Sequence, residues 1–362
     1  MIDSPLVDTP LDIFGLSSDA FGEAASRLLP GGSGIFGRVY AAAFATGRLE
    51  PEPQGASQSS SASWRRHFRA ALLEPRRLEE ENGPLGVTRK AVLATADGRE
   101  VECVSIPMPG QAGTPPRRTL CLSSQAGCRM GCTFCETGRK GLARGLTAAE
   151  IVAEVVTARA ILGWDCRNLV FMGMGEPLDN FSELAQALAV LSDRRGFAYA
   201  AERITVCTCG PAGGVTRLAG LGLRRLNLSI SLNAGDDAVR DRLMPVNRGH
   251  GLSALADELR RIPRRKNFVL GVNYCLIPGH NDSHDEAQRA AAYCRGLGRT
   301  LLNLIPYNPG TRPLSRAPTP EEMVRFGGWL EQGGMHVRCR AAKGSSIMAG
   351  CGQLGFHSHM LP

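Results

Sequence analysis

The sequence lacks any run that approaches 18 consecutive apolar residues, so it predicts no transmembrane helix. The N-terminal segment MIDSPLVDTP is acidic and has no apolar stretch, so no secretory signal peptide is expected. A cytoplasmic location is then the default prediction. There is also no internal repeat. These absences predict a protein that does not enter a membrane.

The composition permits a large folded protein with a polyanionic partner. The chain has 362 residues, of which 43% are hydrophobic, enough for a large core and more than one domain. Lys and Arg number 42 against 34 Asp and Glu, and the net charge of +8 suits nucleic acid without identifying it. Twelve cysteines in a chain without a secretory signal favour metal binding or catalysis over a disulfide framework.

Residues 1 to about 105 are expected to form an accessory domain of helices followed by a hairpin. The segments AFGEAASRLL and FGRVYAAAFATGRL predict helices, and the polar stretch GASQSSSAS at 55–63 predicts a linker. The basic stretch from Ser63 to Glu81 predicts another helix. Alternation of apolar and polar residues around Asp97 and Gly98 predicts a β-hairpin.

Residues 106 to 334 show short apolar strands that alternate with helices, which predicts an α/β fold with a parallel sheet, either open or closed as a partial barrel. Thr147 and Glu150 form the pattern of a capping box, so a helix should begin there. A last strand from Met335 and the remaining tail make up residues 335 to 362. The six expected strands lie around Leu120 and at the segments that start at Asn168, Arg203, Leu226, Phe268 and Leu301.

Cys128, Cys132 and Cys135 are spaced C-x3-C-x2-C in AGCRMGCTFCETGRKG. A structural zinc site takes four ligands, and Cys121, seven residues upstream, could be the fourth. An iron–sulfur cluster also normally takes four thiolates, but a cluster held by three leaves one iron open to a substrate or cofactor. Three unrelated buried cysteines are the third interpretation. Ligand number and spacing favour the open cluster.

This spacing, with Phe134 directly before the third cysteine, resembles the radical S-adenosylmethionine (SAM) superfamily. The resemblance implies a (βα)6-type partial barrel and a [4Fe–4S] cluster held by the three cysteines. It also implies that SAM binds the open iron through its amino and carboxylate groups and is cleaved to a 5'-deoxyadenosyl radical. The cofactor carries this chemistry and the protein positions it.

Further motifs narrow the resemblance. TLCLSSQAGCRMGCTFCETGRKG, FMGMGEPLDN, LSISLNAGDDAVRDRLMPVN, IPGHND, NLIPYNPG and GCGQL occur in this order. Together they resemble RNA methyltransferases that act on carbon 2 of an adenine in 23S ribosomal RNA and, in some members, in transfer RNA. A sister group methylates carbon 8 and confers antibiotic resistance. The resemblance extends from about Val87 to Leu354, and the first 85 residues match only in general character.

The resemblance implies three catalytic residues. Carbon 2 of adenine lies between two ring nitrogens and is too electron-poor to attack a sulfonium methyl group. In the family a first SAM therefore methylates a cysteine, and a second SAM generates the radical that takes hydrogen from the S-methyl group. The carbon radical adds to the base, a second cysteine resolves the crosslink through a disulfide, and a base removes the ring proton. The matching residues are Cys351, Cys121 and Glu102, although an exposed strand position is the alternative for Glu102.

The resemblance also implies contacts with SAM. The loop GMGEP at 173–177 follows an apolar strand, where glycine lets the backbone approach a ligand closely. Gly175 and Glu176 in this loop match cofactor contacts. The other matching positions are Cys207, Ser231, Leu232, Asn233 and Asn308.

Several positions depart from the family pattern. Cys207 stands where the family has serine, and Asn233 stands where it has histidine; both can still hydrogen-bond, cysteine only weakly. Ser345 and Ser346 replace an acidic pair, and Gly350 replaces alanine. These changes leave the radical machinery intact and indicate a divergent branch near the carbon-8 enzymes.

Three other features have both a functional and a simpler interpretation. His280 and His284 could bind a metal, but a polar loop with Asp282 or Ser283 capping a helix is simpler. The C-x-C pair of Cys207 and Cys209 could supply metal ligands, although packing is favoured. The basic segments WRRHFR (64–69) and RIPRRKN (261–267) are either solvated surface or phosphate contacts.

The predicted function is therefore a radical SAM RNA methyltransferase that consumes two SAM molecules per turnover. An electron donor such as flavodoxin and a monomeric state are expected. The rivals are a carbon-8 methylase, another divergent radical enzyme of the same architecture, and a non-catalytic zinc protein that binds RNA. Cys351 in GCGQL favours an enzyme, because a protein that only binds RNA has no need of it.

Overall fold

The computed structural model describes residues 9–29, 33–50, 58–110 and 117–355. It contains two compact units. The first consists of Met1–Glu74, Leu146–Asp165 and Ser182–Ala200, and the second of Pro75–Gly145, Cys166–Phe181 and Ala201–Pro362. The division predicted at residues 105 and 334 stays a prediction, because compactness does not measure independent folding.

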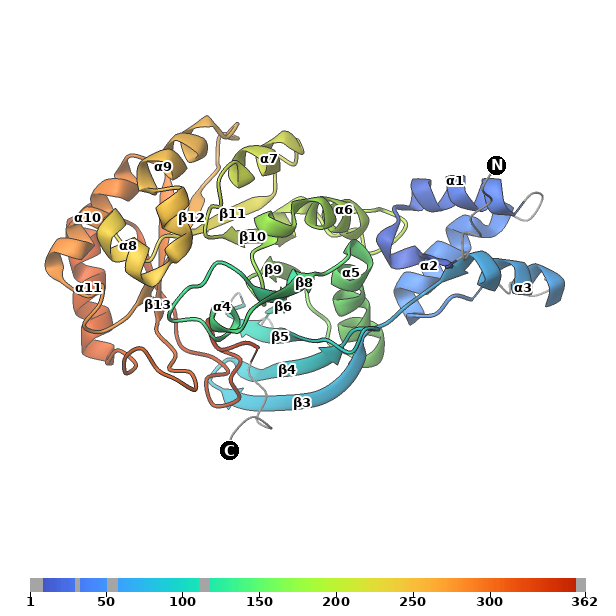
Figure 1. Ribbon diagram of the computed structural model, residues 1–362, viewed down its shortest axis with the longest axis horizontal. Helices are drawn as coiled ribbons and strands as arrows, with labels where there is room; N and C mark the ends of the chain where they lie inside the picture. The colour runs from blue at the N-terminus through green and yellow to red at the C-terminus, as the bar shows by residue number, and fades with distance from the viewer. Residues whose placement is uncertain (1–8, 30–32, 51–57, 111–116, 356–362) are drawn as a thin grey trace, which may run out of the picture. The chain divides into compact units, whose positions relative to one another are not determined.

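A sheet of ten strands is the framework of the second unit (Figure 1), in the order β14-β13-β12-β11-β10-β9-β6-β5-β4-β3. Neighbouring strands from β6 to β14 are parallel, which confirms the predicted α/β fold. These strands are β6 (Arg117–Leu122), β9 (Asn168–Phe171), β10 (Ile204–Thr208), β11 (Asn227–Ser231), β12 (Leu270–Leu276), β13 (Thr300–Pro306) and β14 (Val337–Cys339). They coincide with the six predicted strands and the predicted last strand.

The remaining strands of the sheet are β3 (Glu74–Gly83), β4 (Gly86–Ala94) and β5 (Glu100–Met108). β4 and β5 are antiparallel and form the predicted hairpin, with Ala94 opposite Glu100. The turn uses Gly98 at φ 76°, a backbone conformation that glycine adopts without strain. The hairpin then pairs with β6 through β5, so it extends the sheet of parallel strands.

Alternation along the parallel strands gives the sheet a polar inner face and an apolar outer face. In the register of the sheet, Cys207 lies beside Ser229, Ser231 beside Asn273, and Cys275 beside Ile305 on one face. The residues between them point to the other face and are apolar. This outer row includes Val206, Leu228, Ile230, Val272, Leu302 and Leu304, all buried.

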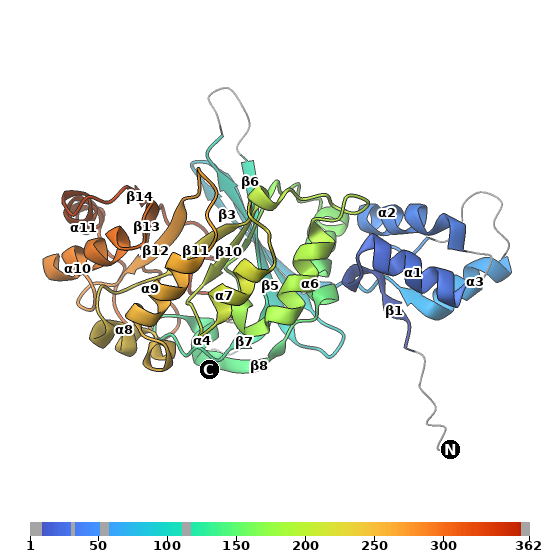
Figure 2. The same cartoon turned by 90° about the horizontal axis from the view of Figure 1, so that it is seen from above.

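Helices of the second unit lie along the outer face of β10 to β14 (Figure 2). Tyr274 of β12 packs against Phe326 of α11 with ring centroids 5.1 Å apart, which shows how the outer face is covered. Ser283 accepts a hydrogen bond from the Glu286 backbone N–H and caps α10, as one of the two predicted capping residues. The helices are α7 (Gly214–Gly220), α8 (Asp237–Leu243), α9 (Leu252–Arg261), α10 (His284–Arg295) and α11 (Pro320–Gln332).

An aromatic cluster forms the core of the first unit. Phe21 lies 5.7 Å from Tyr40, 5.7 Å from Trp64 and 4.8 Å from Phe68, measured between ring centroids. The predicted capping box of Thr147 and Glu150 is present at the start of α5. The elements are β1 (Leu11–Asp12), α1 (Ser18–Leu28), α2 (Phe36–Thr46), α3 (Gln58–His67), β2 (Phe68–Arg69), α5 (Ala148–Val156) and α6 (Phe181–Leu191).

Two predictions in this part of the chain are wrong. Residues 58–63 of the predicted linker belong to α3, because the buried Trp64 ties the helix to the aromatic cluster; residues 55–57 lie outside the described residues. The helix predicted from Ser63 to Glu81 ends at His67, and Glu74–Gly83 is strand β3. Pairing with β4 outweighs the helix preference of this Glu- and Arg-rich segment, and its exposure alternates residue by residue.

Within the residues that the structure describes, no helix is both long enough and apolar enough to cross a membrane.

Replacement of Trp64 by Ala should destabilise the first unit by about 3–5 kcal/mol, because it removes a fully buried aromatic side chain. Urea unfolding followed by circular dichroism measures this loss. Arg66→Ala, at an exposed position of the same helix, should change the free energy of unfolding by less than about 0.5 kcal/mol. Unchanged unfolding of Trp64→Ala together with weaker RNA binding would assign Trp64 to RNA instead.

Candidate active site

The three clustered cysteines lie in a loop held by its own small sheet. β7 (Gln125–Cys128) and β8 (Gly141–Gly145) pair antiparallel on either side of α4 (Glu136–Lys140). Gly127 has φ 90°, and a Cβ there would lie 2.0 Å from the Gly141 carbonyl oxygen. Only glycine permits this close approach of the two strands. The loop is therefore fixed at its base by the pairing of β7 with β8.

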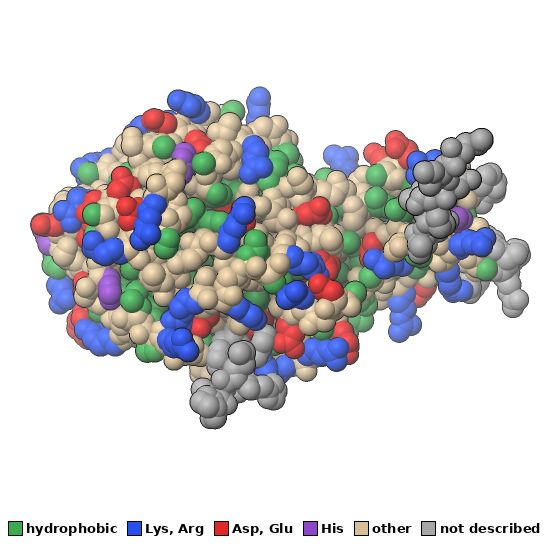
Figure 3. Space-filling view, in the orientation of Figure 1, with side chains coloured by type: hydrophobic (Ala, Val, Ile, Leu, Met, Phe, Trp, Pro, Cys, Tyr) green, Lys and Arg blue, Asp and Glu red, His purple; other side chains and the backbone are tan. Residues whose placement is uncertain are grey.

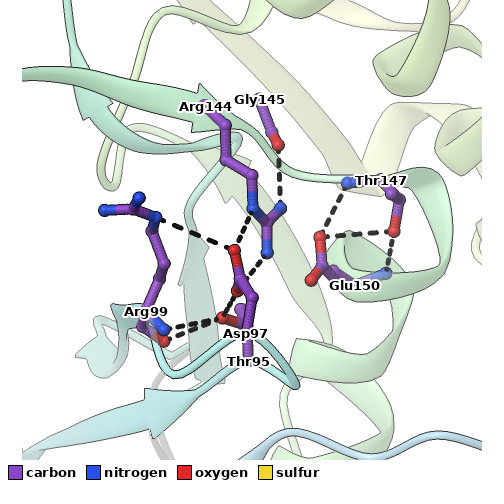
Figure 4. Close-up of polar contacts among 7 residues, drawn as sticks. All are labelled: Thr95, Asp97, Arg99, Arg144, Gly145, Thr147 and Glu150. Carbon is purple, nitrogen blue, oxygen red and sulfur yellow. Dashed lines mark hydrogen bonds and ion pairs between the residues drawn. The ribbon is translucent and has the colours of Figure 1, made fainter.

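An ion pair ties this small sheet to the β4–β5 turn (Figure 4). The Arg144 guanidinium of β8 donates hydrogen bonds of 2.8 and 2.7 Å to the two Asp97 carboxylate oxygens. Thr95 donates its hydroxyl to the same carboxylate at 2.5 Å. The Arg144 hydrogen bond holds the pKa of Asp97 below its usual range. The β4–β5 hairpin, which the sequence predicted, is thus bonded to β8, the strand that follows the cysteine loop.

A cavity of about 150 Å³ opens at the carboxyl ends of the parallel strands, where α/β sheets bind their ligands. It brings together nine of the residues predicted to act, from five separate segments. These are Cys128, Cys132, Cys135, Gly175, Glu176, Cys207, Ser231, Asn233 and Cys351. Of the other predicted residues, Glu102, Cys121, Leu232 and Asn308 do not line it.

The donor set of the loop fits an iron–sulfur cluster. Cys128, Cys132 and Cys135 present three soft thiol ligands to one cavity, and Gly138 packs so tightly that a Cβ would lie 3.0 Å from the Cys132 backbone. Burial raises the pKa of all three thiols, that of Cys128 to about 12. Among the described residues no three His, Cys, Asp or Glu side chains are grouped to hold one metal ion, as zinc would require. Thiolates around a cluster bind separate iron atoms instead.

The glycine-rich loop after β9 packs against the residues that precede the cysteines. Gly175 has φ 96°, and a Cβ there would lie 2.5 Å from the Gln125 Cβ. Glu176 donates its backbone N–H to the Gln125 side chain at 2.9 Å, and its carboxylate accepts from the Thr208 hydroxyl at 2.6 Å and the Cys209 N–H at 2.8 Å. Burial raises the pKa of Glu176. A fixed carboxylate therefore faces the cavity beside the cysteine loop.

Asn233 is structurally suited to its position. Its φ of 58° lies in the left-handed region, where asparagine is tolerated better than most residues. Its side chain accepts a hydrogen bond from the Cys275 N–H at 2.8 Å, so it also fixes the end of β12. Leu232, predicted as a neighbouring contact, is fully buried, and its N–H donates to the Asn273 carbonyl.

The C-terminal tail is fastened to the cysteine loop. The Glu136 N–H donates to the Gly352 carbonyl at 2.7 Å, and the Thr137 hydroxyl donates to the Leu354 carbonyl at 2.6 Å. Asn308 donates to the Cys351 carbonyl at 3.2 Å, so this predicted cofactor contact holds the tail in the structure. The Cys351 sulfur lies 3.7 Å from the Met172 sulfur. These bonds place Cys351 over the same cavity as the clustered cysteines.

Ser346, one of the two serines that replace the family's acidic pair, binds a carboxylate from an earlier part of the chain. Glu81 of β3 accepts hydrogen bonds from the Ser346 hydroxyl at 2.5 Å, the Ser346 N–H at 2.8 Å and the Gly344 N–H at 2.6 Å. These bonds help to lower the pKa of Glu81. An acidic side chain at position 346 would face this carboxylate, so serine and Glu81 suit one another.

Glu102 and Cys121 lie on the inner face of the sheet. Val104 is paired with Cys121, and Glu102 shares a face with Val104 because it lies two residues before it on β5. Glu102 is fully buried, and the Gly355 N–H of the tail donates to its carboxylate at 3.3 Å. Burial, opposed by the positive charge of Lys90, raises the pKa of Glu102 to about 7. The exposed strand position considered for Glu102 is therefore wrong.

Sequence reasoning missed several residues that line the cavity. Asn273 and Cys275 come from β12, and Thr208 is the last residue of β10. Their signal was present: small or polar residues occupy every second position of the buried segment Leu270–Leu276. Phe171 and Met172, at the end of β9, gave no such signal.

The basic segments do not form a surface with exposed aromatic side chains. In WRRHFR, Trp64 and Phe68 are buried in the aromatic cluster, so they are not available to stack on bases. In RIPRRKN, Arg264 donates to the Leu259 carbonyl at 3.0 Å and lies over the Phe268 ring. Figure 3 shows Lys and Arg side chains scattered among Asp and Glu over the face in view. Contacts of these segments with phosphate stay a prediction.

The raised pKa of Glu102 gives a pH-dependent stability. Folded Glu102 binds its proton with a pKa of about 7, above the ordinary value of 4.5, so the free energy of unfolding falls as pH rises from about 4.5 to 7. Glu102→Gln should remove about 3 kcal/mol of this fall. Urea unfolding at pH 5 and pH 8 measures it, with Glu23→Gln on an exposed face of α1 as the control. The same fall in Glu102→Gln and in the unsubstituted protein would contradict the assignment.

Comparison with known proteins agrees with this arrangement. The model of the radical SAM superfamily matches residues 122–291. The chain also resembles a radical SAM methyltransferase from Sphaerobacter thermophilus, known from a crystal structure, with a TM-score of 0.81 and 32% identity. That similarity covers 95% of this chain and 99% of the other.

The chain is also similar to curated proteins that are named as RNA methyltransferases. The dual-specificity RNA methyltransferase RlmN of Anaeromyxobacter sp. is 42% identical over 302 residues, which are 80% of this chain and 78% of that protein. The RlmN of Syntrophotalea carbinolica is 42% identical over 268 residues, 74% of this chain and 69% of that protein. The chain therefore belongs to the RlmN family of radical SAM RNA methyltransferases.

Proposed function

We propose that the protein methylates carbon 2 of an adenine in 23S ribosomal RNA, with transfer RNA as a second substrate, through a methylated Cys351. The supporting observation is that Cys351 lines the same cavity as Cys128, Cys132 and Cys135, more than two hundred residues away in the sequence. A tail cysteine held at this place has no role in simple RNA binding.

Cys128, Cys132 and Cys135 are the proposed ligands of a [4Fe–4S] cluster, and Glu176 and Ser231 with the Gly175 backbone are proposed to bind SAM beside it. When bound, these groups supply an electrophilic methyl group and a radical that abstracts hydrogen. The remaining steps depend on side chains of the chain itself.

Cys351 is the proposed methyl acceptor. Its side chain opens onto the cavity, while the surrounding protein raises the pKa of its thiol and the positive charge of Arg340 opposes that rise. A thiolate is the nucleophile that displaces a methyl group from a sulfonium. The sulfur then carries the methyl carbon that is passed to the RNA base.

Glu102 is the proposed base that takes the ring proton. Burial raises its pKa to about 7, which suits an acceptor that must be able to bind and release a proton near neutral pH. The Gly355 N–H bonds its carboxylate to the segment that carries Cys351. Glu102 and the methyl-bearing tail are therefore linked by one hydrogen bond.

Cys121 is the proposed resolving thiol. It lies on the inner face with Glu102, and it is buried in β6 between Val104 and Val170. In the structure Cys121 is buried and Cys351 is exposed. Attack of the Cys121 thiolate on the Cys351 sulfur would form a disulfide as the carbon–sulfur bond to RNA breaks.

The proposed cycle has further requirements. It uses two SAM molecules, one to methylate Cys351 and one for hydrogen abstraction, and it needs a small electron donor such as flavodoxin. We infer a monomer that acts in the cytoplasm, where ribosomal and transfer RNA occur.

Anaerobic incubation with iron and sulfide should give a brown protein with broad visible absorption and about four iron atoms per chain. Cys132→Ala should lose most of this iron, because only two of the three thiolates remain. Cys339→Ala, at an exposed position of β14, should retain it. A colourless protein that contains one zinc ion would refute the cluster assignment.

Mass spectrometry of RNA after reaction tests the product and the two cysteines together. The unsubstituted protein should produce 2-methyladenosine. Cys351→Ala should give no methylated RNA, because the methyl carrier is lost, and Cys121→Ala should accumulate a covalent protein–RNA adduct. Cys339→Ala should behave as the unsubstituted protein.

Two results would change the assignment. A product of 8-methyladenosine would place the protein with the carbon-8 enzymes. Normal turnover by Cys351→Ala or Cys121→Ala would remove that cysteine from the mechanism.

A further inference from the structure

Arg240 is a buried cation beneath the cavity. It lies on α8 and is 0% exposed. Its Nε donates to the Leu232 carbonyl at 3.0 Å, and one terminal nitrogen donates to the carbonyls of Cys209 at 2.8 Å and Ser231 at 3.1 Å. The other terminal nitrogen donates to the Asn247 side-chain oxygen at 2.6 Å. One guanidinium therefore binds the carboxyl ends of both β10 and β11.

The four acceptors of Arg240 among the described residues are neutral, so its hydrogen bonds provide no counterion. Carboxylates reach it only indirectly: Asn247 donates its amide to Asp237 at 2.8 Å and Asp241 at 2.7 Å. A guanidinium removed from water is costly unless negative charge lies nearby. Negative charge at the site beside Arg240 would offset this cost.

The cysteine loop is the adjacent site. Leu243, one turn after Arg240 on α8, accepts a hydrogen bond from the Thr133 N–H at 3.0 Å. Thr133 lies between Cys132 and Cys135 in the loop. Leu243 and Met244 also pack in one buried cluster with Cys128 and Cys209, against which Cys132 lies. The helix that carries the guanidinium thus touches the loop that carries the thiols.

The Cys209 peptide lies between two opposite charges. Its N–H donates to the Glu176 carboxylate, and its carbonyl accepts from Arg240. Burial lowers the pKa of Arg240, and negative charge on Cys209, Tyr293, Cys132 or Asp237 would raise it. The pKa of Arg240 therefore depends on the charge of this site, and the charge of Arg240 in turn changes the electrostatic potential at the site.

We propose that Arg240 is a positioning residue that holds the strand ends under the cavity and supplies a fixed positive charge to the cysteine site. Its charge stabilises the reduced form of a bound cluster, because reduction adds one negative charge. This inference rests on the proposed cluster site. It assigns to Arg240 a role in setting the reduction potential.

The test is a redox titration of the reconstituted cluster followed by electron paramagnetic resonance. Arg240→Met should shift the reduction potential to a more negative value, whereas Arg240→Lys, which keeps the charge, should shift it less. Arg240→Gln removes the charge but keeps an amide that can donate hydrogen bonds to backbone carbonyls. It should also shift the potential to a more negative value, and it decides the question if Arg240→Met fails to fold.

Arg118→Met is the matched control. Arg118 also donates to backbone carbonyls, of Val87 at 2.7 Å and Ser105 at 3.1 Å, but it lies near the start of β6, whereas the cavity opens at the carboxyl ends of the strands. Its loss should lower stability and leave the potential unchanged. Unchanged potentials in Arg240→Met and Arg240→Gln proteins with full iron content would overturn the inference alone. Failure of the unsubstituted protein to bind a cluster would instead overturn the proposed site.

Discussion

Side chains of a parallel strand alternate between two faces, and the rest of this structure depends on that constraint. The outer face is apolar and is covered by helices, as the contact of Tyr274 with Phe326 shows. The inner face carries Cys207, Ser231 and Asn273 from three different strands. Because the strands are parallel, their carboxyl ends meet at one edge, and the cavity forms there. The alternation of side chains therefore puts the hydrophobic core on one face of the sheet and the candidate active-site residues on the other.

Glutamate carboxylates hold the loops around this cavity. Glu176 binds the Cys209 N–H, Glu81 binds the N–H groups of Gly344 and Ser346, and Glu136 binds the Thr311 N–H at 2.8 Å. Each satisfies backbone donors that would otherwise be buried without a partner. They also connect segments that are far apart in the chain. Two contacts hold the tail that carries Cys351. The Glu136 N–H donates to the Gly352 carbonyl, and the Glu81 carboxylate accepts from Gly344 and Ser346.

Much of the fold follows from local patterns. The six strands, the hairpin at Asp97 and Gly98, and the capping box at Thr147 were predictable because alternation, turn residues and caps act over a few residues. The strand β3 was not, because its Glu-rich sequence favours a helix and only pairing with β4 makes it a strand. The same holds for α3, which is fixed by burial of Trp64 among residues from α1 and β2.

By itself, the sequence determined the three-cysteine motif, the order of the strands and the candidate residues, because these depend on residue type and spacing. The tertiary structure decided which of them meet. It brought Cys351 to the cysteine loop, buried Glu102 beneath the tail and placed Arg240 under the strand ends. No spacing rule contains this information, because each contact joins segments separated by a long stretch of chain and depends on how the sheet and its loops pack.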